Sequence, residues 1–575
     1  MNKNFLQFNF HHTVQQFTNP IKVWNTNNIN EITTIFEELE QFLDKGYYIA
    51  GFVSYEAAPA FDPSYHVHKQ HNQLPLIWLA AFEKPTDHKD NVEGMVYQLS
   101  EWKHTTSYQA YKHNITSIKK AIELGNTYQV NYTTRLKAHF SGDPYSFYQQ
   151  LVKNQAASYC AYLDIGSNQI LSASPELFFQ VKNGKIITKP MKGTIKRGRT
   201  YEEDLQFKQN LRNSEKDQAE NVMIVDLLRN DIGRIAKPGS VKVKSLFDIE
   251  TYPTVHQMTS TIEANLETKK VYDWFQALFP CGSITGAPKV ETMKYIAELE
   301  DTPREIYCGA IGWISPEREA TFNVPIRTVI LNGNDAIYGT GGGITWDSTS
   351  INEYHELNQK AEILHQKRTT VSLLESIKLD NGSYPLMTYH LQRLKQSTQY
   401  FGYPFHEEEI KEKLFMLAAQ YQNGCYKVRL LYHPSGRMEL EHQPVKALEE
   451  PIQTALAPEP IDRRNIYLYH KTTNREMYEK LDQDKPDHVL TSLLWNKEGH
   501  ITEYTIGNVV VEKDGRFYTP PVSDGLLPGT YREQLIEEKI LLEKSVSLSE
   551  LGEYDQIWFI NSVRGWVKVQ LDEIL

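Results

Sequence analysis

The sequence predicts an α+β protein made of two modules. Strand-like and helical runs follow one another along its 575 residues, and 40% of the residues are apolar, which allows large buried cores. A new strand pattern starts at Thr369, directly after a predicted helix at 350–366 and a short charged join. We therefore expect one domain at residues 1–368, with an N-terminal part at 1–100 and a core at 101–368, and a second domain at 369–575.

Charge and cysteine content exclude several classes of protein. The net charge of −11 argues against a general nucleic-acid binder, which needs a basic face. It does not exclude a small anionic substrate, because local and global charge are separate matters. Four cysteines in 575 residues are too few for a disulfide scaffold. None of them forms a CxxC pair, which argues against a zinc knuckle.

Nothing in the sequence predicts a membrane segment. The longest strongly apolar stretch, Pro75–Phe82, is far shorter than the roughly 20 residues that span a bilayer. The N-terminus, MNKNFLQFNFHH, lacks the apolar run of a secretory signal. We expect a soluble, cytoplasmic protein with neither nucleic acid nor membrane as a partner.

Periodicity predicts the individual elements. Helical spacing of apolar residues predicts helices at 108–124, 204–232 and 350–366, the second interrupted near Asn213. In the second module a strand at 369–379 and a turn at 380–382 precede a helix that carries His390–Leu394. Strand patterns of the first module occur at 47–55, 74–82, 128–137, 159–165, 307–315, 322–331 and 336–338.

The run Gly339-Thr340-Gly341-Gly342-Gly343 has two interpretations. It lacks the third glycine of a dinucleotide-binding loop, and the residues after it are predicted as loop. One interpretation is a tight turn. The other is a stretch of backbone N–H groups exposed to an anion, since glycine lets a ligand approach the main chain closely.

Several segments of the first module share a common pattern. They are GNTYQVN (125–131), SPELF (174–178), KPMKGT (189–194), DQAEN and VDLLRND (217–221 and 225–231), FPCGSITGAPK (279–289), VPIRT (324–328) and GTGGGI (339–344). In this order they resemble the chorismate-utilising enzymes, a family that includes anthranilate synthase, isochorismate synthase and aminodeoxychorismate synthase component I. The resemblance covers about residues 100–365 and implies two packed, antiparallel-rich sheets with helices outside and the site between them.

This resemblance implies a magnesium site. Mg²⁺ prefers oxygen ligands, usually one or two protein carboxylates completed by substrate and water. Glu353 and Glu356 lie three residues apart on a predicted helix and share a face, while Glu220 lies next to an apolar run. The resemblance assigns Glu220 and Glu356 to Mg²⁺, with Glu353 beside them; a solvated helix face is the alternative for Glu353.

The resemblance also implies a pocket for chorismate. Arg327 would bind a substrate carboxylate as a bidentate fork. Glu176 would be the general acid that protonates the leaving ring hydroxyl, which requires a carboxyl of raised pKa. Further pocket residues would be Tyr307, Lys360, Ser283, His256, Gln129 and the backbone amides of Gly341, Gly342 and Gly343.

Two positions distinguish members of the family. Members that add water to the ring carry a lysine base where this chain has Gln129, which cannot take a proton at neutral pH. Lys192 occupies a position where anthranilate synthases carry Ala and where aminodeoxychorismate synthases carry a lysine that attacks the ring. A lysine is a nucleophile only when its setting lowers its pKa, so a solvated side chain is the alternative for Lys192.

Amination needs a nitrogen source that the sequence does not contain. No cysteine has the glycine-flanked turn of a glutamine amidotransferase nucleophile, and Cys281 belongs to the chorismate motif. The chain is therefore expected to use ammonia from a separate glutamine amidotransferase subunit.

The second module carries another set of motifs. They are HLQRL (390–394), YHKTTNR (469–475), TEYTIGN (502–508), YTPP (518–521), GLLPGTYR (525–532) and FINS (559–562). Together they resemble fold-type IV pyridoxal phosphate enzymes, in particular aminodeoxychorismate lyase, and imply a two-part α/β domain. The resemblance assigns the Schiff-base lysine to Lys471, the acid facing the pyridine nitrogen to Glu503, and phosphate contacts to Arg393, Gly529, Thr530, Asn561 and Ser562.

The expected function is bifunctional synthesis of 4-aminobenzoate. Chorismate would be aminated in the first module, and pyruvate would be eliminated in the second. Two alternatives stay open: an anthranilate synthase fused to an aminotransferase-like domain, and a synthase whose second domain only binds. The second module also lacks the strand and loop that precede it in stand-alone relatives, so either residues 1–366 supply this cover or the lyase half is weak.

Overall fold

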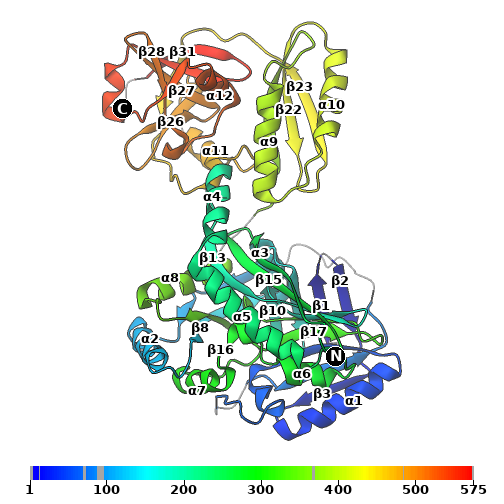
Figure 1. The fold of residues 1–575 in the computed structure, drawn as a ribbon. Coiled ribbons are helices and arrows are strands. Elements are labelled where there is room, and N and C mark those ends of the chain that lie inside the picture. The colour runs from blue at the N-terminus through cyan, green and yellow to red at the C-terminus, as the bar shows by residue number, and fades with distance from the viewer. Residues whose placement is uncertain are drawn as a thin grey trace. The chain divides into compact units, whose positions relative to one another are not determined.

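The computed structural model describes residues 4–11, 13–68, 73–86, 96–365, 369–483 and 485–572. Its internal contacts divide the chain into two compact units (Figure 1). Unit 1 comprises Met1–Lys196 and Lys208–Arg368, and unit 2 comprises Arg197–Phe207 and Thr369–Leu575. Most of the charged join, at residues 366–368, lies outside the described residues.

Two ten-stranded sheets form the framework of unit 1, and their paired strands run antiparallel. The first sheet contains β1 (Phe5–Phe10), β2 (Thr13–Thr18), β6 (Tyr97–Leu99), β7 (Lys103–His104), β8 (Gln129–Gly142), β9 (Tyr159–Asp164), β10 (Gln169–Ser174), β16 (Gly286–Ala287), β19 (Thr328–Asn332) and β20 (Asp335–Ile344). The second contains β3 (Lys22–Thr26), β4 (Tyr48–Val53), β5 (Ile77–Phe82), β11 (Leu177–Lys182), β12 (Lys185–Lys189), β13 (Met191–Lys196), β14 (Lys242–Thr251), β15 (Val255–Asn265), β17 (Ala310–Ile314) and β18 (Ala320–Asn323).

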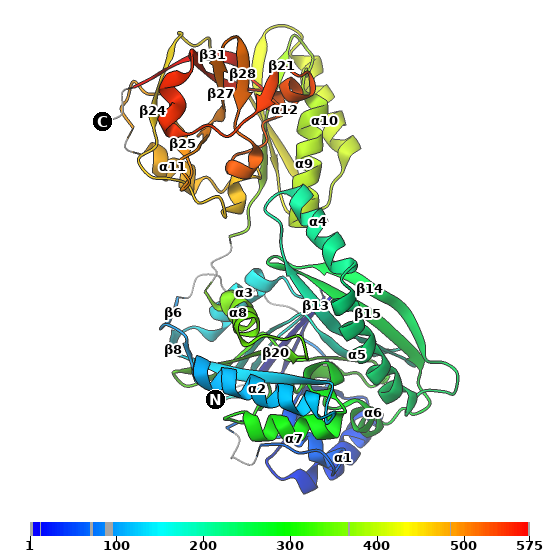
Figure 2. The same ribbon diagram turned by 60° about the vertical axis from the view of Figure 1, so that its left-hand side comes forward.

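Helices cover the outer faces of both sheets. Apolar residues of α2, α7 and α8 pack with β8 and β20 in one buried cluster, and Figure 2 shows α2 and α7 beside β8. A larger cluster joins α1, α5 and α6 to the second sheet. The helices are α1 (Ile32–Asp44), α2 (Tyr108–Glu123), α3 (Pro144–Gln155), α5 (Glu215–Gly233), α6 (Val271–Leu278), α7 (Lys289–Leu299) and α8 (Ser350–Ala361), with short 3₁₀ turns η1 (Ile29–Glu31), η2 (Tyr55–Ala60), η3 (Gly282–Ile284) and η4 (Glu362–Leu364).

The two sheets also face each other through a shared core. Phe8 and Leu163 of the first sheet belong to the same buried cluster as Phe52 and Trp78 of the second. This arrangement confirms the expected pair of antiparallel sheets with helices outside. The predicted break near Asn213 is confirmed too, since α4 (Tyr201–Arg212) and α5 are separate helices.

The glycine run does not form the tight turn that the sequence suggested. Residues 339–343 lie inside β20, where Gly341 pairs with Thr133 and Gly343 with Asn131 of β8. A Cβ on Gly341 would stand 2.3 Å from the carbonyl oxygen of Tyr132, so close strand approach, and not turn geometry, requires the glycine. The predicted strand at 322–331 is likewise wrong, because Arg327, at φ 53°, separates β18 from β19.

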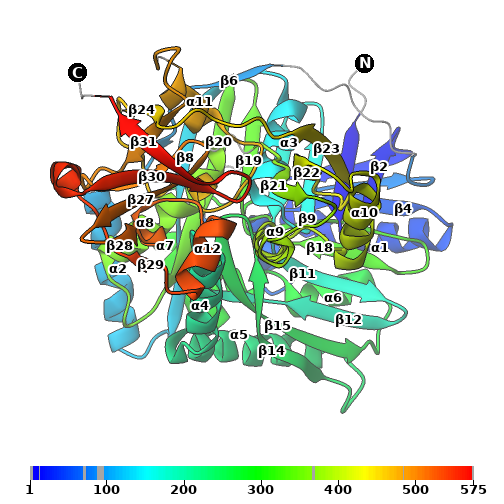
Figure 3. The same cartoon turned by 90° about the horizontal axis from the view of Figure 1, so that it is seen from above.

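Unit 2 contains a three-stranded and an eight-stranded sheet. The smaller sheet is β21 (Leu373–Asp380), β22 (Cys425–Tyr432) and β23 (Met438–Pro444). Helices α9 (Met387–Phe401) and α10 (Glu407–Gln420) pack on one face of it through a buried apolar cluster (Figure 3). Its other face carries alternate residues of the same strands, among them Ser376, Lys427 and Arg429.

The larger sheet of unit 2 has the order β26-β25-β24-β31-β30-β27-β28-β29, and β24 pairs in parallel with both of its neighbours. Its strands are β24 (Ile452–Leu456), β25 (Thr491–Trp495), β26 (Ile501–Tyr504), β27 (Gly507–Lys513), β28 (Arg516–Thr519), β29 (Leu541–Glu543), β30 (Gln556–Asn561) and β31 (Gly565–Leu571). The remaining elements are α11 (Glu476–Asp482), α12 (Thr530–Glu537), η5 (Ile466–Leu468), η6 (Val522–Asp524) and η7 (Leu548–Glu553).

The segment Arg197–Phe207 belongs to unit 2 although it lies far from the second module in sequence. Tyr400 of α9 donates a hydrogen bond to the carbonyl oxygen of Gly198 at 2.8 Å, and Arg197 lies 4.2 Å from the centroid of the Tyr400 ring. Gln396 of α9 also donates to Glu202 at 3.0 Å. Residues from the first half of the chain therefore supply part of the cover of unit 2, a contribution that no sequence pattern located.

Within the described ranges, we find no helix with the length and apolar character that crossing a membrane requires.

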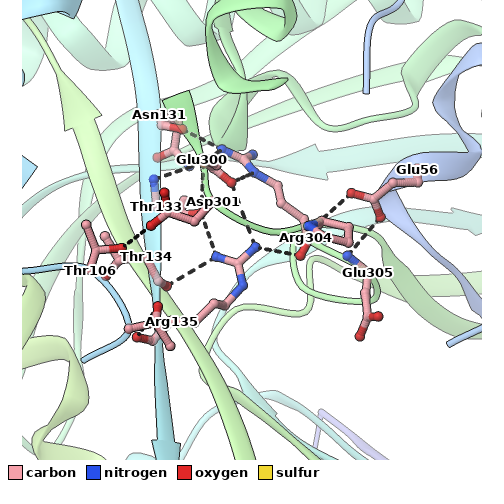
Figure 4. Close-up of polar contacts among 12 residues, drawn as sticks. Glu56, Thr106, Asn131, Thr133, Thr134, Arg135, Glu300, Asp301, Arg304 and Glu305 are labelled. Carbon is pink, nitrogen blue, oxygen red and sulfur yellow. Dashed lines mark hydrogen bonds and ion pairs between the residues drawn. The ribbon is translucent and has the colours of Figure 1, made fainter. Parts of the chain in front are cut away.

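A buried ion pair links the two sheets of unit 1 (Figure 4). Arg304, 2% exposed, donates to both carboxylate oxygens of Glu300 at 2.6 and 3.1 Å. The same guanidinium donates to the carbonyl oxygens of Asn131 on β8 and Ile284 in η3. Its backbone N–H donates to Glu56 in η2, which follows β4 of the second sheet.

We predict that Glu300→Gln lowers the free energy of unfolding of unit 1 by about 3–5 kcal/mol, because it leaves a buried guanidinium without its counter-charge. Urea unfolding followed by circular dichroism measures this change. Glu291→Gln on the same helix, α7, removes only an exposed pair with Lys294 and should cost less than about 1 kcal/mol. Equal effects of the two substitutions would contradict the prediction.

Candidate active sites

A cavity of about 350 Å³ lies between the two sheets of unit 1. Strands β13 and β20 and helices α5 and α8 contribute charged side chains and backbone to its wall. It brings together most of the residues that the sequence assigned to catalysis, metal and substrate. These are Glu176, Lys192, Glu220, Ser283, Tyr307, Arg327, Gly341, Gly342, Gly343, Glu353, Glu356 and Lys360.

Gln129 is not among these lining residues, contrary to the expectation, and neither is His256. Its side chain is fully buried on β15, and its Nδ1 lies 3.2 Å from the hydroxyl of Thr251. The next residue, Gln257, lines the cavity instead, because successive side chains of a strand point to opposite faces. The register of β15 decides this, and the motif alone did not reveal it.

Lys192 points into the cavity from β13. An added Cβ on Gly343 of β20 would lie 3.1 Å from the Nζ of Lys192, so the amine reaches β20, the glycine strand. Burial lowers the pKa of Lys192, and Lys360 adds to this effect, while the carboxylates of Glu220 and Glu176 oppose it. The amine is therefore easier to deprotonate than a solvated lysine, as a nucleophile requires.

Glu176 is a buried carboxyl in contact with Ser283. The Ser283 hydroxyl donates to its Oε1 at 2.5 Å. Burial raises the pKa of Glu176 to about 7, although Ser283 and Lys192 counteract this. A carboxyl that still holds its proton near neutral pH can act as a general acid.

The three glutamates assigned to the metal all line the same cavity. Around Gly342, an added Cβ would lie 3.3 Å from Glu353 and 3.8 Å from Glu356. Burial raises the pKa of Glu220 and Glu353, whereas Lys360, 2.6 Å from Glu356, lowers the pKa of that carboxyl. In the part of the chain that the structure describes, no three His, Cys, Asp or Glu side chains form a ready-made metal cage. The donors fit Mg²⁺ nonetheless, since it commonly takes one or two carboxylates and completes its shell with substrate and water.

Two basic residues stand beside the glycine strand. Lys360 donates to the carbonyl oxygen of Gly341 at 2.9 Å, and Arg327 donates to the carbonyl oxygen of Lys360. The ring of Tyr307 closes this end, where a Cβ on Gly339 would lie 2.5 Å from it. The arrangement offers positive charge and an aromatic wall to an anionic ligand.

Gln129 on β8 has an unusual environment. Its side chain is 1% exposed, and neither its amide nitrogen nor its oxygen has a hydrogen-bond partner among the described residues. It reaches toward Gly343, where an added Cβ would stand 1.8 Å from Nε2. A buried amide without partners costs free energy, and Gln129 is not among the lining residues of the cavity.

Sequence reasoning missed several lining residues of this cavity. Asn131 and Asp217 lie inside quoted motifs but received no role, and Lys216 precedes one of them. Asn131 follows Gln129 by two residues on β8, so strand alternation could have placed both side chains on one face.

A second cavity, of about 560 Å³, lies within unit 2. Every residue that the sequence assigned to this module lines it: Arg393, Lys471, Glu503, Gly529, Thr530, Asn561 and Ser562. Burial lowers the pKa of Lys471 to about 8, with Arg393 adding to the effect. Glu503 lies at the end of β26, where burial raises its pKa to about 8 while it accepts hydrogen bonds from Tyr478 at 2.9 Å and the backbone N–H of Leu527 at 3.2 Å.

Two of the proposed phosphate contacts, Gly529 and Thr530, form the start of α12, and Arg393 reaches the residue before it. Gly529 is the N-cap residue, and a Cβ there would stand 1.9 Å from the Asn508 side chain, so only glycine fits. Arg393 is partly engaged already, because it donates twice to buried Glu375, at 2.6 and 2.9 Å, and once to the carbonyl oxygen of Pro528. Glu375 itself carried no predicted role; although burial opposes this, Arg393 and His390 lower the pKa of Glu375 to about 2, which favours the carboxylate.

The comparisons with known proteins address the whole chain. Residues 4–366 match the model of the chorismate binding enzymes. The chain belongs to this family. Residues 372–571 of this chorismate binding enzyme match the model of amino-transferase class IV, which corresponds to the second sequence resemblance.

Individual relatives refine this result for the first module. "Aminodeoxychorismate synthase component 1" of Klebsiella aerogenes is 40% identical over 51% of this chain and 64% of its own length. The protein of that name from Escherichia coli is 42% identical over 45% of this chain and 58% of its own length. The chain thus spans about three fifths of these relatives. The crystal structure of anthranilate synthase component I from Streptococcus pneumoniae matches 64% of this chain and 91% of its own with a TM-score of 0.53 and 25% identity.

We predict that Lys471 reacts with an acylating reagent in a pH-dependent manner with a midpoint near pH 8. Burial favours the neutral amine, so the reactive form is lost only as the pH falls below about 8, whereas a solvated lysine loses it below about 10.4. Mass spectrometry of the apoprotein between pH 6 and 11 measures the modification. Lys480, exposed and paired with Glu459, should show a midpoint above 10; identical profiles would refute the assignment.

Proposed function

We propose that this chorismate binding enzyme makes 4-aminobenzoate in two reactions. Unit 1 replaces the 4-hydroxyl of chorismate with an amino group, and unit 2 removes pyruvate from the resulting 4-amino-4-deoxychorismate. The observation that carries the first assignment is Lys192, a lysine of lowered pKa that shares a cavity with a proton-holding glutamic acid and four further acidic side chains.

In the amination, Lys192 and Glu176 act on the same ring. The Lys192 amine forms a bond to ring carbon C2 while the C4–O bond breaks, and Glu176 gives its proton to the leaving oxygen. Ammonia then forms a bond to C4 as the bond between Lys192 and C2 breaks. Glu176, with a pKa of about 7, is a carboxyl that can give a proton and regain one at neutral pH.

The remaining cavity residues bind and orient the substrate. Arg327 and Lys360 supply positive charge for a carboxylate at the glycine strand. Glu220, Glu353 and Glu356 would hold Mg²⁺, which when bound neutralises substrate carboxylate charge. Gln129, which reaches toward Gly343 behind the cavity wall, cannot act as the base of a water-adding enzyme.

The ammonia comes from a separate glutamine amidotransferase in this proposal. A glutaminase needs a thiolate nucleophile, and burial raises the pKa of Cys160, Cys281 and Cys308 to about 12. The relatives named component 1 also belong, by that name, to systems of more than one component.

In unit 2, Lys471, Glu503 and the start of α12 fit pyridoxal phosphate. When bound, this cofactor supplies an electron-withdrawing ring that stabilises negative charge next to the substrate nitrogen. Lys471, with a pKa of about 8, takes and returns protons at the substrate carbon, and Glu503 holds a proton near the position of the ring nitrogen. Gly529 and Thr530 offer backbone N–H groups of the helix N-terminus to phosphate.

We predict that Lys192→Ala reduces amination of chorismate by about 10³-fold or more, because it removes the nucleophile. Chorismate, Mg²⁺, ammonium and pyridoxal phosphate are supplied, and the products are separated by chromatography. Lys189→Ala is the matched control, since Lys189 ends β12, the strand before β13 in sequence, and pairs with Glu250. Full activity of the Lys192 variant would exclude the covalent route, and anthranilate as the wild-type product would overturn the synthase assignment.

We predict that Lys471→Ala stops the pathway at 4-amino-4-deoxychorismate. The variant retains the cavity of unit 1, so the intermediate should accumulate while 4-aminobenzoate disappears. The wild type loaded with pyridoxal phosphate should show a visible absorbance band that the variant lacks. A wild-type protein that cannot be loaded would instead favour a second domain that binds without catalysis.

A further inference from the structure

The cavity of unit 2 has a large excess of positive charge. Besides Lys471 and Arg393, its lining contains five further basic residues, and Glu503 is the one acidic residue among the lining residues that the structure describes. Arg393 and Arg429 pair with Glu375 and Glu441, and a cofactor phosphate contributes a further charge of about −2 at most, so part of the positive charge stays unbalanced. The five residues are Lys427, Arg429, Lys446, Arg475 and Arg564.

The small sheet presents two of these residues to the cavity. On β22, Val428 and Leu430 point into the core beneath α9 and α10, so Lys427 and Arg429 point to the opposite face. Arg429 is balanced, because it pairs with Glu441 of β23 at 3.0 Å. Lys427 has no ion pair or hydrogen bond from its amine to any described residue, although it is partly buried.

Arg564 belongs to the turn between β30 and β31 of the larger sheet. Its guanidinium donates to the carbonyl oxygen of Lys446, a neutral partner. Burial and the neighbouring guanidinium groups of Arg564, Arg429 and Arg475 lower the pKa of Lys427. Like charges gathered without a counter-charge destabilise the protein, and this cost is removed only when an anion binds.

We propose that Lys427 and Arg564 bind a carboxylate of the substrate and thereby select dicarboxylates over ordinary amino acids. This inference rests on the proposed function of unit 2. The substrate amine must reach Lys471, and 4-amino-4-deoxychorismate carries two carboxylates away from that amine. A simple α-amino acid has a single carboxylate, next to its amine, and would leave these two cations without a partner.

Lys427→Gln tests the proposal in the holoenzyme. KM for 4-amino-4-deoxychorismate should rise about 10- to 100-fold, the range expected for loss of a charge-assisted hydrogen bond, while kcat changes little. The cofactor absorbance band should be unchanged, which separates substrate binding from cofactor binding. Lys427→Arg keeps the positive charge and should retain most of the affinity.

Lys378→Gln is the matched control. Lys378 lies directly opposite Lys427 on β21 and on the same face of the sheet, but it pairs with Asp380 at 2.8 Å and does not line the cavity. The control removes the same charge from an adjacent position, so its KM should stay within about threefold of the wild type. An unchanged KM for the Lys427 variant, or an equal rise for the control, would overturn the proposal.

Chorismate provides a readout that does not depend on turnover. It has the same two carboxylates but no amine, and its binding to unit 2 can be followed by perturbation of the cofactor band without Mg²⁺ or ammonium. The dissociation constant should rise about 10- to 100-fold in Lys427→Gln. If the wild type binds chorismate here but releases no 4-aminobenzoate, the lyase assignment fails while the carboxylate site stands. If turnover is normal and Lys427→Gln binds chorismate as the wild type does, the carboxylate site fails alone.

Discussion

The buried pair of Arg304 and Glu300 is the constraint on which the first cavity depends. A guanidinium without water must direct its donors to fixed acceptors, and here the acceptors come from β8, from η3 and from Glu300 itself. The pair therefore fixes the segment that carries Ser283 relative to the strand that carries Gln129. Glu56 extends the same network to the second sheet through the backbone N–H of Arg304. A substrate pocket between two sheets requires such a link, because small shifts of one sheet would separate its reacting groups.

The two cavities make an amine easier to deprotonate in the same way. In both, burial lowers the pKa of a lysine, Lys192 in unit 1 and Lys471 in unit 2. Their surroundings differ in charge. Lys192 faces several carboxylates suited to a cation. The charged residues around Lys471 are mostly basic, apart from Glu503, whose raised pKa favours the protonated form. The first cavity is thus suited to a metal and a dianion together, and the second to a phosphate and a dianion.

The polypeptide passes from unit 1 into unit 2 directly after β13. Lys192 lies on β13, and the residue directly after that strand begins the segment Arg197–Phe207, which packs on α9 within unit 2. The segment contributes contacts to unit 2 through Gly198, whose carbonyl oxygen accepts from Tyr400, and through Arg197, which lies over the Tyr400 ring. Fusion has therefore made part of the first module a structural element of the second.

The sequence by itself predicted the proposed chemistry, through its resemblance to known families, and most of the elements. Motif residues such as Lys192, Glu176, Lys471 and Glu503 were identified because their side-chain types and order are tied to the reaction, and helices follow directly from local periodicity. Only the tertiary structure decided which residues face a cavity. His256 does not face the cavity because of the register of its strand. The glycines of β20 are necessary for the close approach of the neighbouring strand. Lys427 lines a cavity together with basic residues of another sheet. Register, close packing and unbalanced charge arise from residues distant in sequence, so no local pattern records them.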